Sequence, residues 1–253
     1  MIGRVTLVGA GPGDPELLTF KAARAIGRAT VLLVDDLVGD GVLAFARADA
    51  RIVHVGKRGG CASTPQAFTD KLMLAEALKG EEVVRLKGGD PFMFGRGGEE
   101  AEHLRAHGVT VDVVGGITSG MAAAAALGVP LTRRHHAHGV IFVTGHARAH
   151  GPALDWVALG AAAAQGLTLV VYMGVSAVEA LAAGLLQALP PATPAAVVQH
   201  ASLPHQRQLV CTLGTLAERV RDEQIGSPAI VIVGDVLRGV ESLPAALDAT
   251  RAA

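Results

Sequence analysis

The sequence predicts an α/β protein of two domains, with a mainly parallel sheet in the N-terminal domain and a mixed sheet in the C-terminal one. In the first half, short runs of β-branched and aliphatic residues alternate with segments of helical periodicity. These runs are 5–9, 30–35, 50–56, 82–88 and 109–115. Because parallel neighbours need a long crossover, this alternation is typical of a parallel sheet covered by helices on both faces.

The second half has the same kind of runs after a polar stretch, 129–139, in which the apolar pattern stops. We therefore expect an N-terminal α/β domain over residues 1–130 and a C-terminal α/β domain over 131–253. The later runs are 140–145, 167–173, 195–199, 208–213 and 229–235. The third and fourth of them are close together in the chain, which favours an antiparallel pair and hence a mixed sheet.

The helices are predicted from apolar residues that recur three or four positions apart. Each such set should form the buried side of its helix. The sets are Leu18, Ala22, Ala25 and Ile26; Phe68, Leu72 and Ala75; and Val178, Leu181, Leu185 and Leu189 in a helix over 176–189.

The composition excludes several classes of protein. Half of the 253 residues are hydrophobic and 18% are charged, which indicates a globular chain. A net charge of −1 and 3% aromatic residues argue against nucleic acid or an anionic membrane as a partner. The N-terminal apolar stretch is too short for a signal peptide, and Cys61 and Cys211 form neither a disulfide framework nor a zinc spacing. We expect a soluble, cytoplasmic protein.

A metal site is not expected. His135, His136 and His138 lie in the polar stretch, and their spacing matches no defined ligand set. We interpret them as part of a solvated loop.

Three glycine-rich loops follow predicted strands, at 9–18, 87–98 and 115–120. Ligands of α/β sheets bind beyond the carboxyl ends of the strands, so these loops are the candidate site. The first loop does not match the dinucleotide fingerprint, because its glycines stand at the first, third and fifth positions and Asp14 takes the sixth. The segment "VGKRGG" also fails as a phosphate-binding loop, since no Ser or Thr follows its lysine.

The side chains of these loops suit a cationic ligand with an apolar part. Asp14 and Asp90 would tolerate a positive charge, while Phe92 and Met93 offer an apolar wall. Hydroxyl groups in the third loop could bind polar ends of the same ligand. S-adenosylmethionine has this mixture of a sulfonium, an aminocarboxylate and adenosine.

The loop motifs also carry a family resemblance. "VGAGPGDPELLT" resembles the opening loop of the tetrapyrrole (corrin/porphyrin) methylase superfamily. Together with "VGKRGG", "VVRLKGGDPFMFGRGGEE", "GITSG", "FVTGH", "YMGVS" and "SPAIVIVGDV", it is similar to the uroporphyrinogen-III C-methyltransferases of that superfamily. The segment 84–100 is the most specific part, and the motifs cover nearly the whole chain.

The resemblance implies a fold and an activity. Members have two α/β domains with the active site in the cleft between them, and they form homodimers. They transfer methyl groups from S-adenosylmethionine to C2 and C7 of uroporphyrinogen III, which gives S-adenosylhomocysteine and precorrin-2, by way of precorrin-1. Precorrin-2 leads to siroheme, cobalamin and related cofactors.

The resemblance also implies roles for individual residues. Asp35 and Lys57 match the pair of residues that handles the proton in this family. Asp35 also stands at the position where a nucleotide-binding protein keeps the acid that binds ribose. Lys57 could instead pair with a carboxylate of the substrate. Met173 could equally be a core residue. The matched cofactor-binding positions are Pro12, Gly88, Gly89, Asp90, Met93, Thr118, Ser119, Met173, Ala201 and Ala229.

A substrate rich in carboxylates needs basic side chains around it, because guanidinium groups bind carboxylates in a bidentate manner. The candidates are Arg58, Arg85, Lys87, Arg96, Arg133 and Arg134. We select Arg58, Arg96 and Arg133, since each lies in or beside a motif.

The chain departs from the family pattern at Asp36, beside the strand-end aspartate, at Gly115, where a proline is usual, and in the run "TRRHHAHG". Three other interpretations stay open. A different methylase of the superfamily would act on another substrate. A nicotinamide-dependent dehydrogenase would bind NAD(P)H, and a regulator would bind S-adenosylmethionine without turnover.

Overall fold

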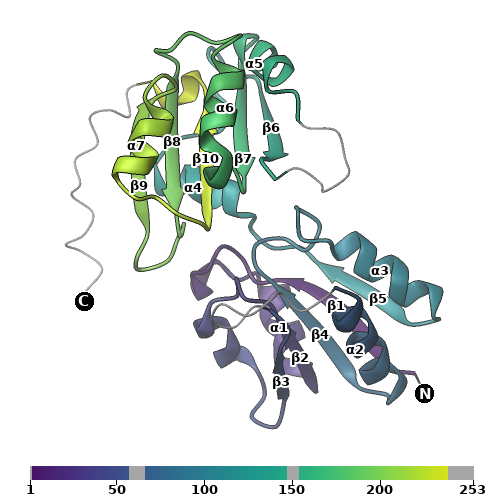
Figure 1. Ribbon diagram of the computed structural model, residues 1–253. Coiled ribbons are helices and arrows are strands. Elements are labelled where there is room, and N and C mark those ends of the chain that lie inside the picture. Colours follow the sequence, from purple (N-terminus) through teal and green to yellow (C-terminus); the bar gives the residue numbers. More distant parts are fainter. Residues whose placement is uncertain (1, 57–65, 147–153, 239–253) are drawn as a thin grey trace. The chain divides into compact units, whose positions relative to one another are not determined.

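Five parallel strands form the N-terminal sheet, in the order β3-β2-β4-β1-β5 (Figure 1). The computed structural model describes residues 2–56, 66–146 and 154–238. The strands are β1 (Arg4–Gly9), β2 (Val31–Val34), β3 (Arg51–His54), β4 (Glu82–Lys87) and β5 (Thr110–Val114). Each run predicted as a strand in this half forms one, and the predicted parallel sheet is confirmed.

Helices cover both faces of this sheet, because successive residues of a strand point to opposite sides. Leu32 and Val84 face α1 (Phe20–Arg28) and the short helix η2 (Asp40–Phe45). Leu33 and Val83, each one position away on the same strands, face α2 (Gln66–Leu78) and α3 (Gly97–Ala106). A further short helix, η1 (Pro15–Leu17), follows the first glycine-rich loop.

The buried side of α2 differs from the predicted one by about one residue. Phe68 is 55% exposed and Ala75 is also exposed, whereas Met73 and Ala77 are fully buried. Glu76 lies beside them, nearly buried and paired with Arg51 and Lys79. The spacing of apolar residues missed this side because a buried, paired carboxylate interrupts it.

The C-terminal sheet is mixed, in the order β6-β7-β10-β8-β9. Only β6 and β7 are parallel neighbours, and the predicted antiparallel pairing of 195–199 with 208–213 is confirmed as β8 with β9. The strands are β6 (Gly139–Thr144), β7 (Leu167–Tyr172), β8 (Pro194–Gln199), β9 (Arg207–Thr212) and β10 (Ala229–Val233).

Three helices pack on one face of this sheet around a common apolar core. The predicted buried side of the helix over 176–189 is confirmed, since its four apolar residues all belong to this core. The helices are α5 (Trp156–Ala164), α6 (Val178–Leu185) and α7 (Leu216–Asp222), with short helices η3 (Val175–Ala177) and η4 (Asp235–Leu237).

Helix α4 (Ser119–Ala126) packs on the opposite face of the second sheet. A β-carbon added to Gly120 would lie 2.5 Å from the hydroxyl of Tyr172 and 2.7 Å from Val170. The chain accordingly divides into two compact units, Met1–Ser119 and Gly120–Ala253. This division precedes the expected boundary at residue 130, because α4 belongs by its packing to the second sheet. No helix in the described part of the chain is long and apolar enough to cross a bilayer.

The thiol of Cys211, on β9, should react slowly. Burial raises its pKa to about 11, and only the thiolate is nucleophilic. At pH 8 we expect iodoacetamide to alkylate Cys211 about 10²-fold more slowly in the folded protein than in urea, as measured by peptide mass spectrometry. Equal rates in the two conditions would contradict this burial.

Candidate functional site

The carboxyl ends of the parallel strands bring the glycine-rich loops together at one edge of the first sheet. Central strands β4 and β1 are neighbours, and β5 lies beside β1. The loops that follow these three strands are therefore adjacent, as the sequence predicts for a ligand site.

Direct backbone contacts join the first two loops. Gly11 donates to the carbonyl of Gly89 at 3.1 Å, and Gly89 donates back to Gly11 at 2.7 Å. A β-carbon on Gly9 would lie 2.6 Å from the carbonyl oxygen of Gly89 and 2.6 Å from the amide nitrogen of Gly116. Glycine is thus required for three backbone segments to approach this closely, and three separate tight turns would not need such an approach.

Asp90 fixes the geometry of the loops with its carboxylate. One oxygen accepts a hydrogen bond from the backbone of Phe92 at 2.8 Å, and the other accepts one from Gly116 at 3.0 Å. The sequence suggested this carboxylate as a partner for a ligand cation. In the structure it joins the second loop to the third, and the backbone of Asp90 remains the candidate contact.

Residues of the second loop have an unusual backbone. Phe94 and Arg96 adopt φ of 55° and 58°, a region that non-glycine residues occupy at a cost. Phe92 is 56% exposed, and Met93 beside it is partly buried. Backbone strain of this kind is frequent at functional sites, and the exposed ring of Phe92 is accessible to a ligand.

The other predicted cofactor positions of this unit lie on the same loops. Pro12 is partly buried between Gly11 and Gly13. Thr118 is 7% exposed, and the hydroxyl of Ser119 would lie 3.7 Å from a β-carbon on Gly89. Asp14 caps η1 by accepting the backbone N–H of Glu16 at 2.9 Å.

Asp35 follows β2 and is held by an arginine. Its carboxylate is 35% exposed and lies 3.4 Å from the guanidinium of Arg85. Its backbone N–H donates to the carbonyl of Leu86, so the residue is fixed against β4. Asp35 therefore presents a partly exposed carboxylate at this edge of the sheet.

Two cations that the sequence offered for substrate carboxylates are instead buried. Arg85 and Lys87 are 4% and 3% exposed, and both pair with Glu100, which is fully buried on α3. Burial and the nearby Arg85 lower the pKa of Lys87 below its usual value, and Glu100 partly opposes this shift. These cations therefore stabilise the interior of the first unit.

Sequence reasoning missed Glu100. The available signal was the pair of cations at alternate positions of an otherwise apolar strand, which places both on one buried face. Two buried cations need an anion, and the first turn of the next helix could supply it.

The backbone N–H of Asp36 donates a hydrogen bond to the carboxylate of Asp35 at 3.1 Å. The carboxylate of Asp36 lies against Gly56, where an added β-carbon would overlap it. The sequence left open whether this second carboxylate would perturb the first or point elsewhere. Lys57 and Arg58 follow immediately and lie outside the described residues.

In the second unit, antiparallel pairing gathers the remaining predicted cofactor positions at one edge. Ala229 begins β10 and is opposite Gln199, while Ile230 is opposite Tyr172. Met173 follows Tyr172 and Ala201 follows His200, so both lie at this same edge. The sequence alone could not place these three segments together.

The backbone at this edge is also strained. Met173, His200 and Ser202 have φ of 53°, 52° and 70°. Met173 is 45% exposed, which argues against the alternative that it is a core residue. Burial and the neighbouring His205 lower the pKa of His200, and the two rings pack in a tilted arrangement with 4.3 Å between their centroids.

Arg96 and Arg133, two of the arginines selected for the substrate carboxylates, are both exposed. Arg96 pairs with Glu99, and Arg133 forms a tight turn by exchanging backbone hydrogen bonds with Ala137. Within the described residues, no three His, Cys, Asp or Glu side chains are grouped as metal ligands.

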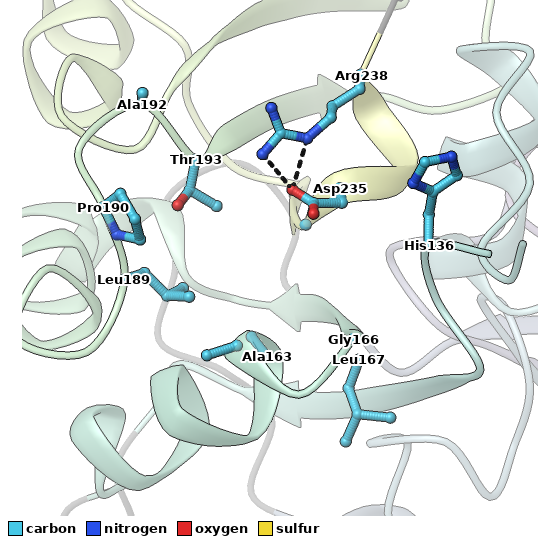
Figure 2. Close-up of a pocket in the computed structure, with 12 residues that line it drawn as sticks. His136, Ala163, Gly166, Leu167, Leu189, Pro190, Ala192, Thr193, Asp235 and Arg238 are labelled. Carbon is cyan, nitrogen blue, oxygen red and sulfur yellow. Dashed lines mark hydrogen bonds and ion pairs between the residues drawn. The ribbon is translucent and has the colours of Figure 1, made fainter.

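A pocket of about 380 Å³ lies at the opposite edge of the second sheet, and Figure 2 shows residues that line it. It is lined by Gly166 and Leu167 at the start of β7 and by Asp235 after β10. None of the residues that we selected for the site lines it, so we do not connect it with the cofactor.

A five-stranded parallel sheet with interlocked glycine-rich loops, followed by a mixed sheet with a strained strand-end edge, defines a two-unit α/β protein whose candidate ligand loops follow the strands. A sequence model described as Tetrapyrrole (Corrin/Porphyrin) Methylases matches residues 4–217. The chain belongs to this family.

Similar proteins agree with this assignment. A uroporphyrinogen-III C-methyltransferase from Pseudomonas aeruginosa is 50% identical over 98% of this chain and 100% of its own length. A crystal structure of a uroporphyrin-III C-methyltransferase from Thermus thermophilus, complexed with S-adenosylhomocysteine, is 43% identical with a TM-score of 0.80, covering 93% of this chain and 99% of that one. A siroheme synthase from Azotobacter vinelandii is 47% identical over 94% of this chain, which spans 51% of that protein's length.

Proposed function

We propose that this protein is a uroporphyrinogen-III C-methyltransferase, which uses S-adenosylmethionine to methylate C2 and C7 of uroporphyrinogen III and gives precorrin-2. The observation that carries this proposal is the interlocking of three glycine-rich loops beside the partly exposed carboxylate of Asp35. The similarity to methyltransferases over the full chain supports it.

The loops fit the cofactor by their chemistry. Glycine at positions 88 and 89 lets a ligand approach the backbone closely, and Met93 and Met173 offer soft, adaptable apolar surfaces. When bound, S-adenosylmethionine supplies a methyl group on a sulfonium. We assign its binding to Pro12, Gly88, Gly89, Asp90, Met93, Thr118 and Ser119 in the first unit and to Met173, Ala201 and Ala229 in the second.

The carboxylate of Asp35 acts as the general base. A pyrrole carbon that accepts a methyl group gains positive charge and must lose a proton, and a positioned carboxylate can take it. The salt bridge with Arg85 keeps Asp35 at the end of β2. Lys57 serves as the proton donor or pairs with a carboxylate of the substrate.

Arg58, Arg96 and Arg133 bind the carboxylates of the tetrapyrrole. For Arg96→Ala we expect about a tenfold loss in affinity for the tetrapyrrole, since a charge-assisted hydrogen bond contributes about 1.5–3 kcal/mol. The affinity for S-adenosylhomocysteine should stay within about twofold. Calorimetry with each ligand measures both, and an equal loss of the two would show that Arg96 does not bind the substrate.

We further infer that the protein acts in the cytoplasm as a homodimer. Its partner is a small-molecule substrate, and it binds neither nucleic acid nor a membrane. The near-neutral charge, the low aromatic content and the family resemblance support this inference. Size-exclusion chromatography with light scattering tests the dimer.

The reaction is tested by anaerobic incubation with uroporphyrinogen III and S-adenosylmethionine, followed by mass spectrometry of the tetrapyrrole. We expect a gain of two methyl groups. A gain of a single methyl group would mean that the reaction stops after the first transfer, and it would indicate that the altered run at 132–139 impairs the second. If the protein binds the cofactor but the tetrapyrrole gains no methyl group, the assignment of the substrate is wrong, and another methylase of the family or a regulator is favoured. If the protein binds NADH and not S-adenosylmethionine, the dehydrogenase is favoured.

A further inference from the structure

Four charged side chains form a continuous cluster inside the first unit. The carboxylate of Glu100 lies 3.2 Å from the guanidinium of Arg85 and 3.0 Å from the ammonium of Lys87. The same guanidinium reaches Asp35 at 3.4 Å. Glu100 is thus linked through one arginine to the proposed base.

Glu100 is the shared anion of this cluster and is fully buried. Removing it would take from Lys87 the carboxylate with which it pairs and leave Arg85 with Asp35 as its anion, in a region of low dielectric constant. It lies in the first turn of α3, where the partial positive charge of the helix N-terminus favours a carboxylate. Gln66 on α2 donates a further hydrogen bond to it at 3.0 Å.

The same carboxylate closes the base of the second glycine-rich loop. Lys87 is the last residue of β4 and Glu100 belongs to α3, so their ion pair joins the two elements that flank residues 88–96. The side chain of Lys87 passes beneath the loop, since a β-carbon on Gly95 would lie 3.3 Å from its Cε. Backbone bonding from Gly97 to Pro91 completes the closure.

We propose that Glu100 is a positioning residue for methyl transfer, which fixes the cofactor loop through Lys87 and the base Asp35 through Arg85. It touches neither ligand and acts through these two cations. This inference rests on the proposed function, and it adds that loop geometry and base geometry depend on one buried carboxylate.

The test compares Glu100→Gln with a matched control. Glutamine keeps the shape of the side chain and removes its charge. The control is Glu76→Gln, because Glu76 is also a nearly buried glutamate that pairs with two cations, Arg51 and Lys79, but contacts neither the loop nor Asp35. Both variants should lose thermal stability, which circular dichroism measures.

Only Glu100→Gln should lose function. We expect kcat to fall about 10- to 100-fold at saturating substrates and Kd for S-adenosylhomocysteine to rise about fivefold or more, while Glu76→Gln keeps both values within about twofold. Unchanged kcat and Kd in folded Glu100→Gln, or equal losses in Glu76→Gln, would overturn the proposal.

Two further measurements keep the test decisive. If Glu100→Gln does not fold, it is replaced by the double variant Glu100→Gln/Lys87→Met, which removes one charge of each sign. The same losses in kcat and in affinity for S-adenosylhomocysteine are expected. Wild-type values of both would overturn the proposal. Binding of S-adenosylhomocysteine by calorimetry needs no turnover. A wild-type protein that binds but does not methylate would contradict the proposed function, while the change in Kd still decides the role of Glu100 in the loop.

Discussion

Asp35→Asn is expected to lower kcat about 10²- to 10⁴-fold, the range typical of a lost general base. Asparagine has nearly the same shape and can still contact Arg85, but it cannot accept the proton that leaves the methylated pyrrole carbon. Because the change leaves the glycine-rich loops intact, Kd for S-adenosylhomocysteine should stay within about threefold. Single-turnover assays with uroporphyrinogen III and calorimetry measure the two quantities.

The control for this substitution is Asp36→Asn. Asp36 is adjacent in sequence, but its carboxylate is directed toward Gly56, so kcat should change less than about threefold. Loss of cofactor binding in Asp35→Asn, with kcat preserved at saturation, would favour the ribose-binding acid. Preserved activity and preserved binding would rule out both roles.

Gly116→Ala is expected to disrupt the cofactor loops. The added methyl group would overlap the carbonyl oxygen of Gly89 and lie 2.9 Å from Cα of Gly9, so the backbones must separate. Overpacking of this kind costs about 1–3 kcal/mol of unfolding free energy. If the loop contacts carry cofactor binding, affinity for S-adenosylhomocysteine should fall about tenfold or more, which corresponds to about 1.4 kcal/mol.

Gly98→Ala is the matched control for that variant. Gly98 lies in the first turn of α3, and apart from its chain neighbours and the backbone of its own helix no atom lies within 4 Å of the position that a β-carbon would take there. Alanine is preferred over glycine in a helix by about 0.5–1 kcal/mol, so this variant should be as stable as the wild type or slightly more stable. Denaturation curves and calorimetry on both variants give the comparison. Wild-type binding by Gly116→Ala would show that close approach of the loops is not needed.

Much of the fold followed from local patterns. All ten predicted strands are present, and the central strands of each sheet, such as β4 and β10, are buried along nearly their whole length, as continuous aliphatic runs predict. The buried side of α2 was displaced, since Glu76 is buried through its ion pairs and not through hydrophobicity. The order of the strands, with β4 between β2 and β1, depends on pairing between distant segments and was not predicted.

The candidate site shows the same division. Glycines that follow strands could be recognised in the sequence, since close backbone approach restricts the residue type. The function of a charged side chain could not be recognised in the sequence, because it depends on which groups from distant segments lie beside it in the folded protein. Asp90, for example, joins two loops through Phe92 and Gly116, and its sequence position alone suggested a ligand partner.

The sequence by itself determined the secondary structure, the glycine-rich loops and the family resemblance, because local spacing and composition encode these properties. Only the tertiary structure decided that Arg85 and Lys87 are buried partners of Glu100, and that Met173, Ala201 and Ala229 lie at one edge. The physical reason is that burial and charge pairing are properties of long-range contacts. A cation on a strand is available to a substrate only if no carboxylate from another element of the fold pairs with it.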